Sequence, residues 1–314
     1  DFGLDNIFIS TNEKYKDLVQ EQIPGLPEGN IYTEPAKRDL TAAMGLTLLR
    51  LKKQGLSGAV AVLWADHFMD HPENFQQALK DAEALLSINS NRIIFLGEKA
   101  RFANHNLGWI RMGDIAEDDR NESGIKQIYA FEEWRYKPDI DTCKKMFGSH
   151  EWVWNPGYCV FDVDFMLGLY GRFQPEMLQQ LKEMVGDEQK LQTEYQNVEA
   201  IHFDKAILEN VDTSEAIVLK VDLGWSDPGT LYALKEALTE QEEHNYVKGD
   251  SVVHSTNDSF IYNEEAGKLV ASIGVEGLVV VNTKDVLLVC HKDAVPNITD
   301  LLDQFRDTDH EKFL

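Results

Sequence analysis

Two aspartates in this chain could hold a divalent metal ion beside phosphate groups. Asp227 lies in a glycine-containing loop after the apolar stretch 216–219, and Asp66 follows the apolar stretch 59–64. Open α/β sheets bind ligands at the carboxyl ends of their strands, and carboxylate oxygens are ligands that Mg²⁺ prefers. The alternative for Asp227 is a turn or helix N-cap residue, since aspartate is common there. The second aspartate in a similar setting favours the metal interpretation.

The elements around these aspartates alternate between strand and helix patterns. Strand-like stretches at 59–64 and 92–97 alternate with helical spacing at 41–50 and 72–79, which predicts an α/β fold with a doubly wound, mostly parallel, Rossmann-like sheet. Because 59–64 is continuously apolar, we expect it to be a central parallel strand covered on both faces.

The chain changes character after a charged linker at 240–243. Short strand-like segments follow at even spacing, separated by Asn, Gly and Asp turns, and a terminal helix is predicted at 298–305. This pattern predicts a small β domain built as a coil of parallel strands. We therefore expect two domains, at residues 1–240 and 248–314.

The amino-acid composition and net charge limit the kinds of partner that this chain is expected to bind. The chain has 314 residues, 43% of them hydrophobic, and a net charge of −24, which argues against nucleic acid held through its phosphates. No apolar run approaches the roughly 20 residues of a membrane span, so no membrane partner is expected. The three cysteines are far apart in the sequence, and a reducing cytoplasm is the simplest compartment.

Several short motifs occur in a fixed order, and their order and spacing are more specific than any one of them. They are Glu34-Pro35-x-x-Arg38-Asp39, Ala65-Asp66-His67, Lys137-Pro138-Asp139, Trp154-Asn155-Pro156-Gly157, Phe203-Asp204-Lys205-Ala206, Gly224-Trp225-Ser226-Asp227-Pro228-Gly229 and Ile273-Gly274-x-x-Gly277-Leu278. Through them nearly the whole chain resembles the sugar-1-phosphate nucleotidyltransferases, most closely the mannose-1-phosphate guanylyltransferases.

The resemblance implies the transfer of GMP from GTP to mannose 1-phosphate, which gives GDP-mannose and pyrophosphate. It implies Mg²⁺ as the cofactor, with Asp66 and Asp227 as its ligands, and Asp66, Asp227 and Lys137 as the catalytic residues. The resemblance also implies that Glu34 accepts hydrogen bonds from the guanine ring N–H and amino group. The implied nucleotide side comprises Glu34, Pro35, Arg38, Asp39, Asp66 and His67, and the implied sugar side comprises Gly108, Asn155, Gly157 and Asp204.

The resemblance also implies a left-handed β-helix in the small terminal domain. In the family that domain mainly mediates packing and assembly, so a homodimer is one expectation.

The chain departs from the family pattern in several places. The family's glycine-rich G-x-G-x-R loop and its lysine would precede Asp1, so the resemblance implies that an N-terminal β-α unit is missing from this sequence. Asp39 replaces the usual Asn, and Tyr136 replaces the Glu of Glu-Lys-Pro; smaller departures are Trp109 for Tyr, Pro156 for Ser and Pro228 for Val. Two alternatives therefore stay open: another sugar-1-phosphate nucleotidyltransferase, or a non-catalytic binding or regulatory paralogue.

Overall fold

A computed structural model describes residues 2–229, 231–239, 243–306 and 308–313. It divides into two compact units, a larger one of Asp1–Leu63 and Pro72–Leu223 and a smaller one of Trp64–His71 and Gly224–Leu314. The predicted domain boundary at residue 240 lies outside the described residues, and the two predicted domain ranges remain a prediction.

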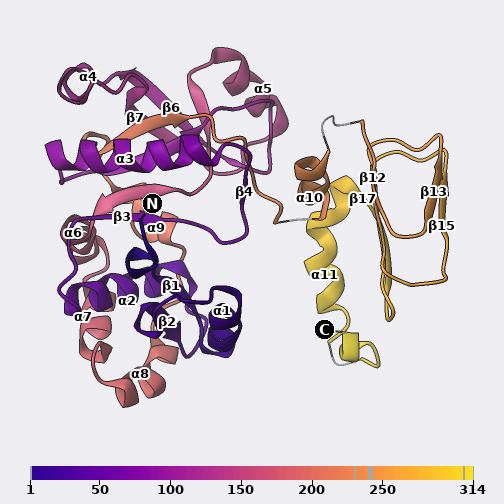
Figure 1. The fold of residues 1–314 in the computed structure, drawn as a ribbon, viewed down its shortest axis with the longest axis horizontal. Coiled ribbons are helices and arrows are strands. Elements are labelled where there is room, and N and C mark those ends of the chain that lie inside the picture. Colours follow the sequence, from indigo (N-terminus) through magenta and orange to yellow (C-terminus); the bar gives the residue numbers. More distant parts are fainter. Residues whose placement is uncertain (1, 230, 240–242, 307, 314) are drawn as a thin grey trace. The chain divides into compact units, whose positions relative to one another are not determined.

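A seven-stranded sheet forms the centre of the larger unit (Figure 1). In sheet order its strands are β10 (Ala216–Val221), β7 (Ile128–Arg135), β6 (Gly108–Ile115), β8 (Trp152–Asn155), β5 (Ile93–Glu98), β9 (Cys159–Asp162) and β3 (Ala59–Val62), with a further pairing of β10 with β5. The predicted alternation of strands and helices is confirmed.

The direction of the strands corrects one part of the fold prediction. Strands β5 and β10 pair in parallel, whereas β7, β8 and β9 run antiparallel to their neighbours. The sheet is therefore mixed rather than mostly parallel. Apolar runs indicate burial but not direction: β8 and β9, which follow one another closely in the chain, run in the same direction and both pair antiparallel with β5.

The stretch predicted as a central strand is also a correction. Strand β3 lies at one end of the sheet order, and the described residues pair it with β9 alone. The expected cover on both faces is wrong as well, because Ala59 is exposed and the other residues of β3 are only partly buried. The continuous apolar run therefore predicted correctly neither the cover on the faces of this strand nor the hydrogen bonding of its edges.

Helices cover both faces of this sheet. Ile93 and Phe95 of β5 join a core with α2 (Asp39–Lys53) and α6 (Val163–Phe173), whereas the alternate Ile94 and Leu96 are buried outside that core. Successive strand residues point to opposite faces. Helix α3 (Pro72–Ile88) covers the second face, as Figure 1 shows.

The remaining elements of the larger unit are mostly short. Strands β1 (Ile9–Asn12) and β2 (Ile31–Glu34) form a separate parallel pair. The other helices are α1 (Lys16–Gln22), α4 (Glu117–Ser123), α5 (Ile140–Ser149), α7 (Pro175–Met184), α8 (Glu188–Glu194) and α9 (Phe203–Ala206). Throughout the described ranges, every helix is too short or too polar to cross a membrane.

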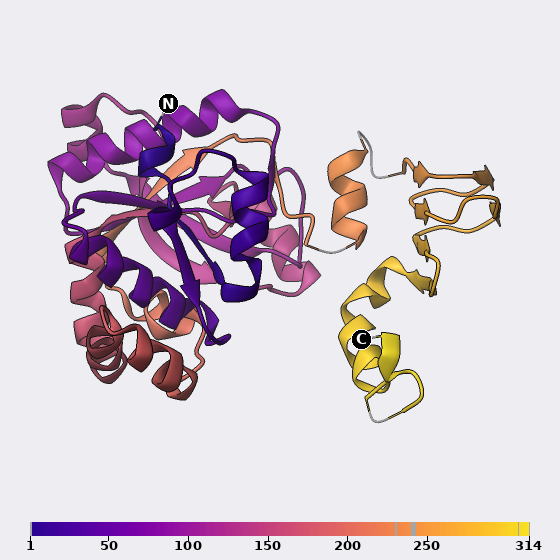
Figure 2. The same cartoon turned by 60° about the horizontal axis from the view of Figure 1, so that its bottom comes forward.

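The smaller unit contains the predicted coil of parallel strands, whose short rungs are visible in Figure 2. Strands β12 (Tyr246–Lys248), β14 (Phe260–Asn263) and β16 (Leu278–Asn282) stack in parallel, as do β13 (Ser251–His254) and β15 (Val270–Ile273). Strand β17 (Leu287–His291) closes the first stack antiparallel to β16. In the part of this unit that the structure describes, the α-helices are α10 (Leu231–Leu238) and α11 (Ile298–Asp303).

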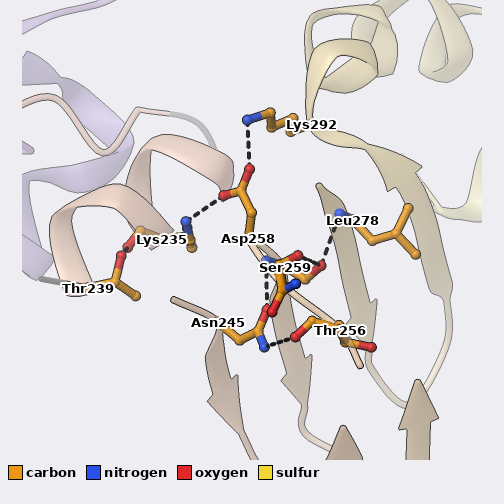
Figure 3. Close-up of polar contacts among 9 residues, drawn as sticks. Lys235, Thr239, Asn245, Thr256, Asp258, Ser259, Leu278 and Lys292 are labelled. Carbon is orange, nitrogen blue, oxygen red and sulfur yellow. Dashed lines mark hydrogen bonds and ion pairs between the residues drawn. The ribbon is translucent and has the colours of Figure 1, made fainter. Parts of the chain in front are cut away.

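Polar side chains join the turns of this coil. Inside the coil, Asn282 donates through Nδ2 to Oδ1 of Asn263 at 2.7 Å, and both side chains are buried. At one turn Asp258 accepts from Lys235 of α10 and from Lys292, each at 2.6 Å (Figure 3). The ammonium of Lys235 is fully buried, so this ion pair ties helix α10 to the coil.

Candidate active site

The candidate residues fall into separate groups. Asp66, His67 and Asp227 belong to the smaller unit, and the other candidates belong to the larger one. In the smaller unit, β4 (Phe68–Met69) pairs antiparallel with β11 (Trp225–Ser226). This pairing places the segment that carries Asp66 beside the segment that carries Asp227, although the two are far apart in the sequence.

A histidine lies against Asp227. His67 Nδ1 accepts a hydrogen bond from Trp225 Nε1 at 3.0 Å, and His67 Nε2 is 3.9 Å from Asp227 Oδ1. Burial lowers the pKa of His67, and the charges of Asp227 and Asp66 partly oppose that effect. We therefore assign a neutral imidazole with its proton on Nε2, directed at the Asp227 carboxylate.

The two aspartates suit Mg²⁺ better than a metal that needs a complete set of protein ligands. Among the described residues no group of three or more His, Cys, Asp and Glu side chains could hold a metal ion. Asp66 is exposed, and the Asp227 side chain is 40% exposed. Mg²⁺ is commonly bound by one or two carboxylates, with water and substrate phosphates completing its octahedron. The residues present fit that pattern.

The predicted nucleotide segment lies between β2 and α2. Glu34 ends β2, Pro35 follows it, and Asp39 begins α2 with a φ of 61°. Aspartate and asparagine are the residues, apart from glycine, that adopt this left-handed conformation most readily. The replacement of the family's Asn by Asp39 therefore suits the backbone and changes the charge.

A distant segment, residues 195–202, covers the nucleotide segment. Arg38 donates to the carbonyl oxygen of Gln196, and His202 Nδ1 lies 3.5 Å from Asp39 Oδ2. Thr41 Oγ1 donates to the carbonyl oxygen of Ile201 at 2.6 Å. The nucleotide segment is therefore held from outside as well as by its own strand and helix.

Three of the predicted sugar residues lie together. Gly108 at the start of β6 pairs with Asn155 at the end of β8, and Gly157 N donates to Asn155 Oδ1 at 2.9 Å. A Cβ atom on Gly108 would lie 3.3 Å from Trp134 Nε1 and 3.4 Å from Asn155 Cβ. Glycine therefore allows the two strands and the indole to approach closely at this position.

Lys137 lies in the loop between β7 and α5, with an exposed side chain. Its φ of 41° is in the left-handed region, which is uncommon for a lysine. The Nζ atom lies 5.3 Å from the ring centroid of Tyr136, the residue that replaces the family's glutamate. The role of Lys137 at a phosphate stays a prediction.

Asp204 of α9 has an unusual environment for a carboxylate. Burial raises its pKa from 3.8 to about 6, and the nearby charges of Glu209 and Asp39 act in the same direction while His202 opposes them. Its carboxyl group can therefore be protonated near the acidic end of the physiological range. A protonated carboxyl group could donate a hydrogen bond to a sugar hydroxyl.

This shift predicts a pH-dependent stability. Between about pH 4 and pH 6 the folded chain binds a proton at Asp204 that the unfolded chain has released, so the free energy of unfolding falls as the pH rises through this window. The Asp204→Asn variant should lack this decrease. Urea unfolding of both proteins at several pH values measures it, with Asp285→Asn, in an exposed turn, as the control. Parallel curves for wild type and Asp204→Asn would contradict the shift.

Sequence patterns did not single out two buried groups in the larger unit. Glu98 at the end of β5 is fully buried and accepts from Leu223 N at 2.8 Å, so it holds the backbone that follows β10. Tyr195 is also fully buried and contacts Glu34. The strand pattern at 92–97 ends just before Glu98 and signalled only β5. Nothing in the sequence around Tyr195 signals its partner, because both contacts join segments distant in the chain.

Two family models match the chain. The model described as "Nucleotidyl transferase" covers residues 2–244, and that described as "MannoseP isomerase/GMP-like beta-helix domain" covers residues 249–305. These matches confirm a nucleotidyl transferase fold followed by a small β-helix-like domain.

Curated proteins similar to this chain include two mannose-1-phosphate guanylyltransferases. The chain is 29% identical to mannose-1-phosphate guanylyltransferase RfbM of Salmonella typhimurium, over 96% of this chain and 62% of that protein. It is also 29% identical to a mannose-1-phosphate guanylyltransferase of Escherichia coli, over 96% of this chain and 63% of that protein. The chain thus spans less than two thirds of the length of these curated relatives.

A solved structure has the same fold. It is described as a mannose-1-phosphate geranyltransferase from Thermus thermophilus and superposes with a TM-score of 0.79 at 23% identity, covering 95% of this chain and 83% of that chain. The match in fold includes residues of both units.

Proposed function

The chain belongs to the nucleotidyl transferase family, and from this premise we propose that it transfers GMP from GTP to mannose 1-phosphate, giving GDP-mannose and pyrophosphate. The observation that carries the proposal is the set of family motifs, from Glu34-Pro35 to Asp227, present in order on the matching fold. The names of the similar proteins support the choice of base and sugar.

The proposed reaction is an in-line displacement at phosphorus. A phosphate oxygen of the sugar phosphate forms a bond to the α-phosphorus of GTP, and the bond from that phosphorus to the bridging oxygen of pyrophosphate breaks. The protein must hold two anions in line and reduce their repulsion. We assign the exposed ammonium of Lys137 to a phosphate group and the Gly108, Asn155 and Gly157 cluster to the sugar.

Asp66 and Asp227 are the residues that would hold Mg²⁺. When bound, this ion neutralises charge on the triphosphate and on the oxygens that attack and leave. His67, which directs Nε2 at Asp227, would orient that carboxylate. At 3.9 Å the imidazole is a close neighbour of the carboxylate and not a hydrogen-bond donor to it.

Base recognition is assigned to Glu34, with Pro35, Arg38 and Asp39 on the same segment. A carboxylate accepts hydrogen bonds only, and guanine offers it two adjacent donors, the ring N–H and the amino group. Adenine and uracil do not offer this pair. Glu34 is half-buried, which strengthens a charged hydrogen bond relative to one in water.

The Glu34→Gln variant tests base recognition. We expect kcat/KM for GTP to fall at least about 10-fold more than kcat/KM for UTP, because the lost charged acceptor reads only guanine. The assay follows pyrophosphate release with mannose 1-phosphate and Mg²⁺. Because the curated relatives are longer than this chain, the product of the complete coding region is used, with Glu21→Gln on the exposed face of α1 as the control.

The same assay, run with several nucleoside triphosphates and sugar phosphates, distinguishes the proposed function from its alternatives. Equal losses for GTP and UTP would count against guanine recognition by Glu34. Preference of the wild type for another nucleoside triphosphate or sugar phosphate would identify a different sugar-1-phosphate nucleotidyltransferase. Absence of turnover with every pair would support a non-catalytic paralogue.

A further inference from the structure

A buried tyrosine holds the carboxylate assigned to the base. The hydroxyl of Tyr195 donates to Glu34 Oε2 at 2.6 Å, and Tyr195 is fully buried whereas Glu34 is half-buried. Tyr195 begins the short helical turn Tyr195–Asn197, which directly follows α8. The two residues are 161 positions apart in the sequence, so only the fold brings them together.

The hydroxyl of Tyr195 is protonated and therefore donates the hydrogen bond to Glu34. Burial raises the pKa of Tyr195 well beyond its usual value, and the hydrogen bond to Glu34 and its charge raise it further. The phenol therefore stays protonated at neutral pH. A hydrogen bond to an ionised acceptor is shorter and stronger than a neutral one, which fits the 2.6 Å separation.

The surroundings keep both partners in place. Arg50 donates to the carbonyl oxygen of Thr33, next to Glu34, at 2.9 Å, and its guanidinium lies 5.4 Å from the ring centroid of Tyr32. On the other side, residues 195–202 are fixed to the nucleotide segment through the contacts of Arg38, Asp39 and Thr41 described above. The segments that carry Tyr195 and Glu34 are therefore both fixed by contacts with other parts of the larger unit.

We propose that Tyr195 is a positioning residue for base selection, acting through Glu34. By holding Oε2 it fixes the plane of the carboxylate, which leaves Oε1 and the second lone pair of Oε2 for a ligand. A base with two adjacent N–H donors needs both oxygens in one plane, whereas a base with one donor needs only one oxygen. The inference rests on the proposed function, and it predicts that Tyr195 matters for the second hydrogen bond to the base.

Inosine triphosphate isolates that second bond, because hypoxanthine has the ring N–H of guanine and lacks its amino group. In the wild type we expect kcat/KM for GTP to exceed that for ITP. In Tyr195→Phe we expect the GTP/ITP ratio to fall about 10-fold, through loss with GTP and little change with ITP. The variant should fold, since it removes one oxygen and water can reach the half-buried Glu34.

Tyr170→Phe is the matched control. Tyr170 is also fully buried, and its hydroxyl donates to the carbonyl oxygen of Thr41 in α2 at 2.7 Å. Removing it deletes a buried tyrosine hydrogen bond close to the nucleotide segment whose acceptor is a backbone carbonyl and not Glu34. Any general loosening of the segment should lower kcat/KM for both nucleotides alike in this variant, with the GTP/ITP ratio unchanged.

The outcomes separate this inference from the proposed function. A wild type that turns over neither nucleotide overturns the proposed function and this inference with it. A wild type that prefers GTP, together with a GTP/ITP ratio unchanged in Tyr195→Phe, overturns the inference alone. A ratio that falls equally in Tyr195→Phe and Tyr170→Phe also overturns it, because the effect would then be a general structural one.

Discussion

Replacement of Asp227 by asparagine should lower the rate of the proposed GMP transfer by more than about 100-fold and leave the fold intact. The carboxylate is assigned to the metal ion, and an amide has no negative charge to offer it. The local structure should survive, because Asp227 Oδ1 accepts from Gly229 N at 2.8 Å and an asparagine oxygen can accept the same bond. The asparagine side chain also retains an oxygen atom that can lie next to His67 Nε2.

The measurement is pyrophosphate release at saturating GTP and mannose 1-phosphate over a range of Mg²⁺ concentrations. Asp285→Asn provides the control, since it makes the same chemical change in an exposed turn between β16 and β17 of the same unit. Asp66→Asn should resemble Asp227→Asn and weaken the apparent affinity for Mg²⁺. Rates like those of the wild type in either site variant would refute the metal assignment.

Local patterns predicted the elements around the candidate site well. The apolar stretch that became β10 is followed by a glycine-containing loop with Asp227, and the alternation of strands and helices indicated the α/β class. These features depend on residues close together in the sequence. The even spacing of short strands after residue 243 likewise indicated the coil, in which each strand pairs with the strand one turn later, β12 with β14 and β14 with β16.

Contacts between distant segments could not be predicted in this way. The apolar run of β3 predicted a central strand, but its place in the sheet depends on which strands pair with its edges. The hydrogen bond from Tyr195 to Glu34 and the burial of Glu98 depend on how remote segments pack. Lys235 gave no signal either, since a lysine in an amphipathic helix usually faces water.

The buried pair of Lys235 and Asp258 predicts a large loss of stability in the smaller unit. In Asp258→Asn the fully buried ammonium of Lys235 loses the carboxylate at 2.6 Å (Figure 3), and removing one partner of a buried ion pair costs about 3 to 5 kcal/mol. The backbone should tolerate the change, because Asp258 has a φ of 50° and asparagine adopts that conformation as readily as aspartate. A loss of stability in Asp258→Asn can therefore be attributed to the missing negative charge.

Hydrogen exchange of the amides in β12 to β17 measures this stability within the unit itself. Asp303→Asn is the matched control, because the ion pair of Asp303 with Arg306 is exposed and should contribute less than about 1 kcal/mol. Adding Lys235→Met to Asp258→Asn should restore much of the protection, since the buried charge is then absent and Lys292 can reach water at its partly exposed end. If Asp258→Asn and Asp303→Asn gave equal protection, the buried pair would not be what stabilises helix α10 on the coil.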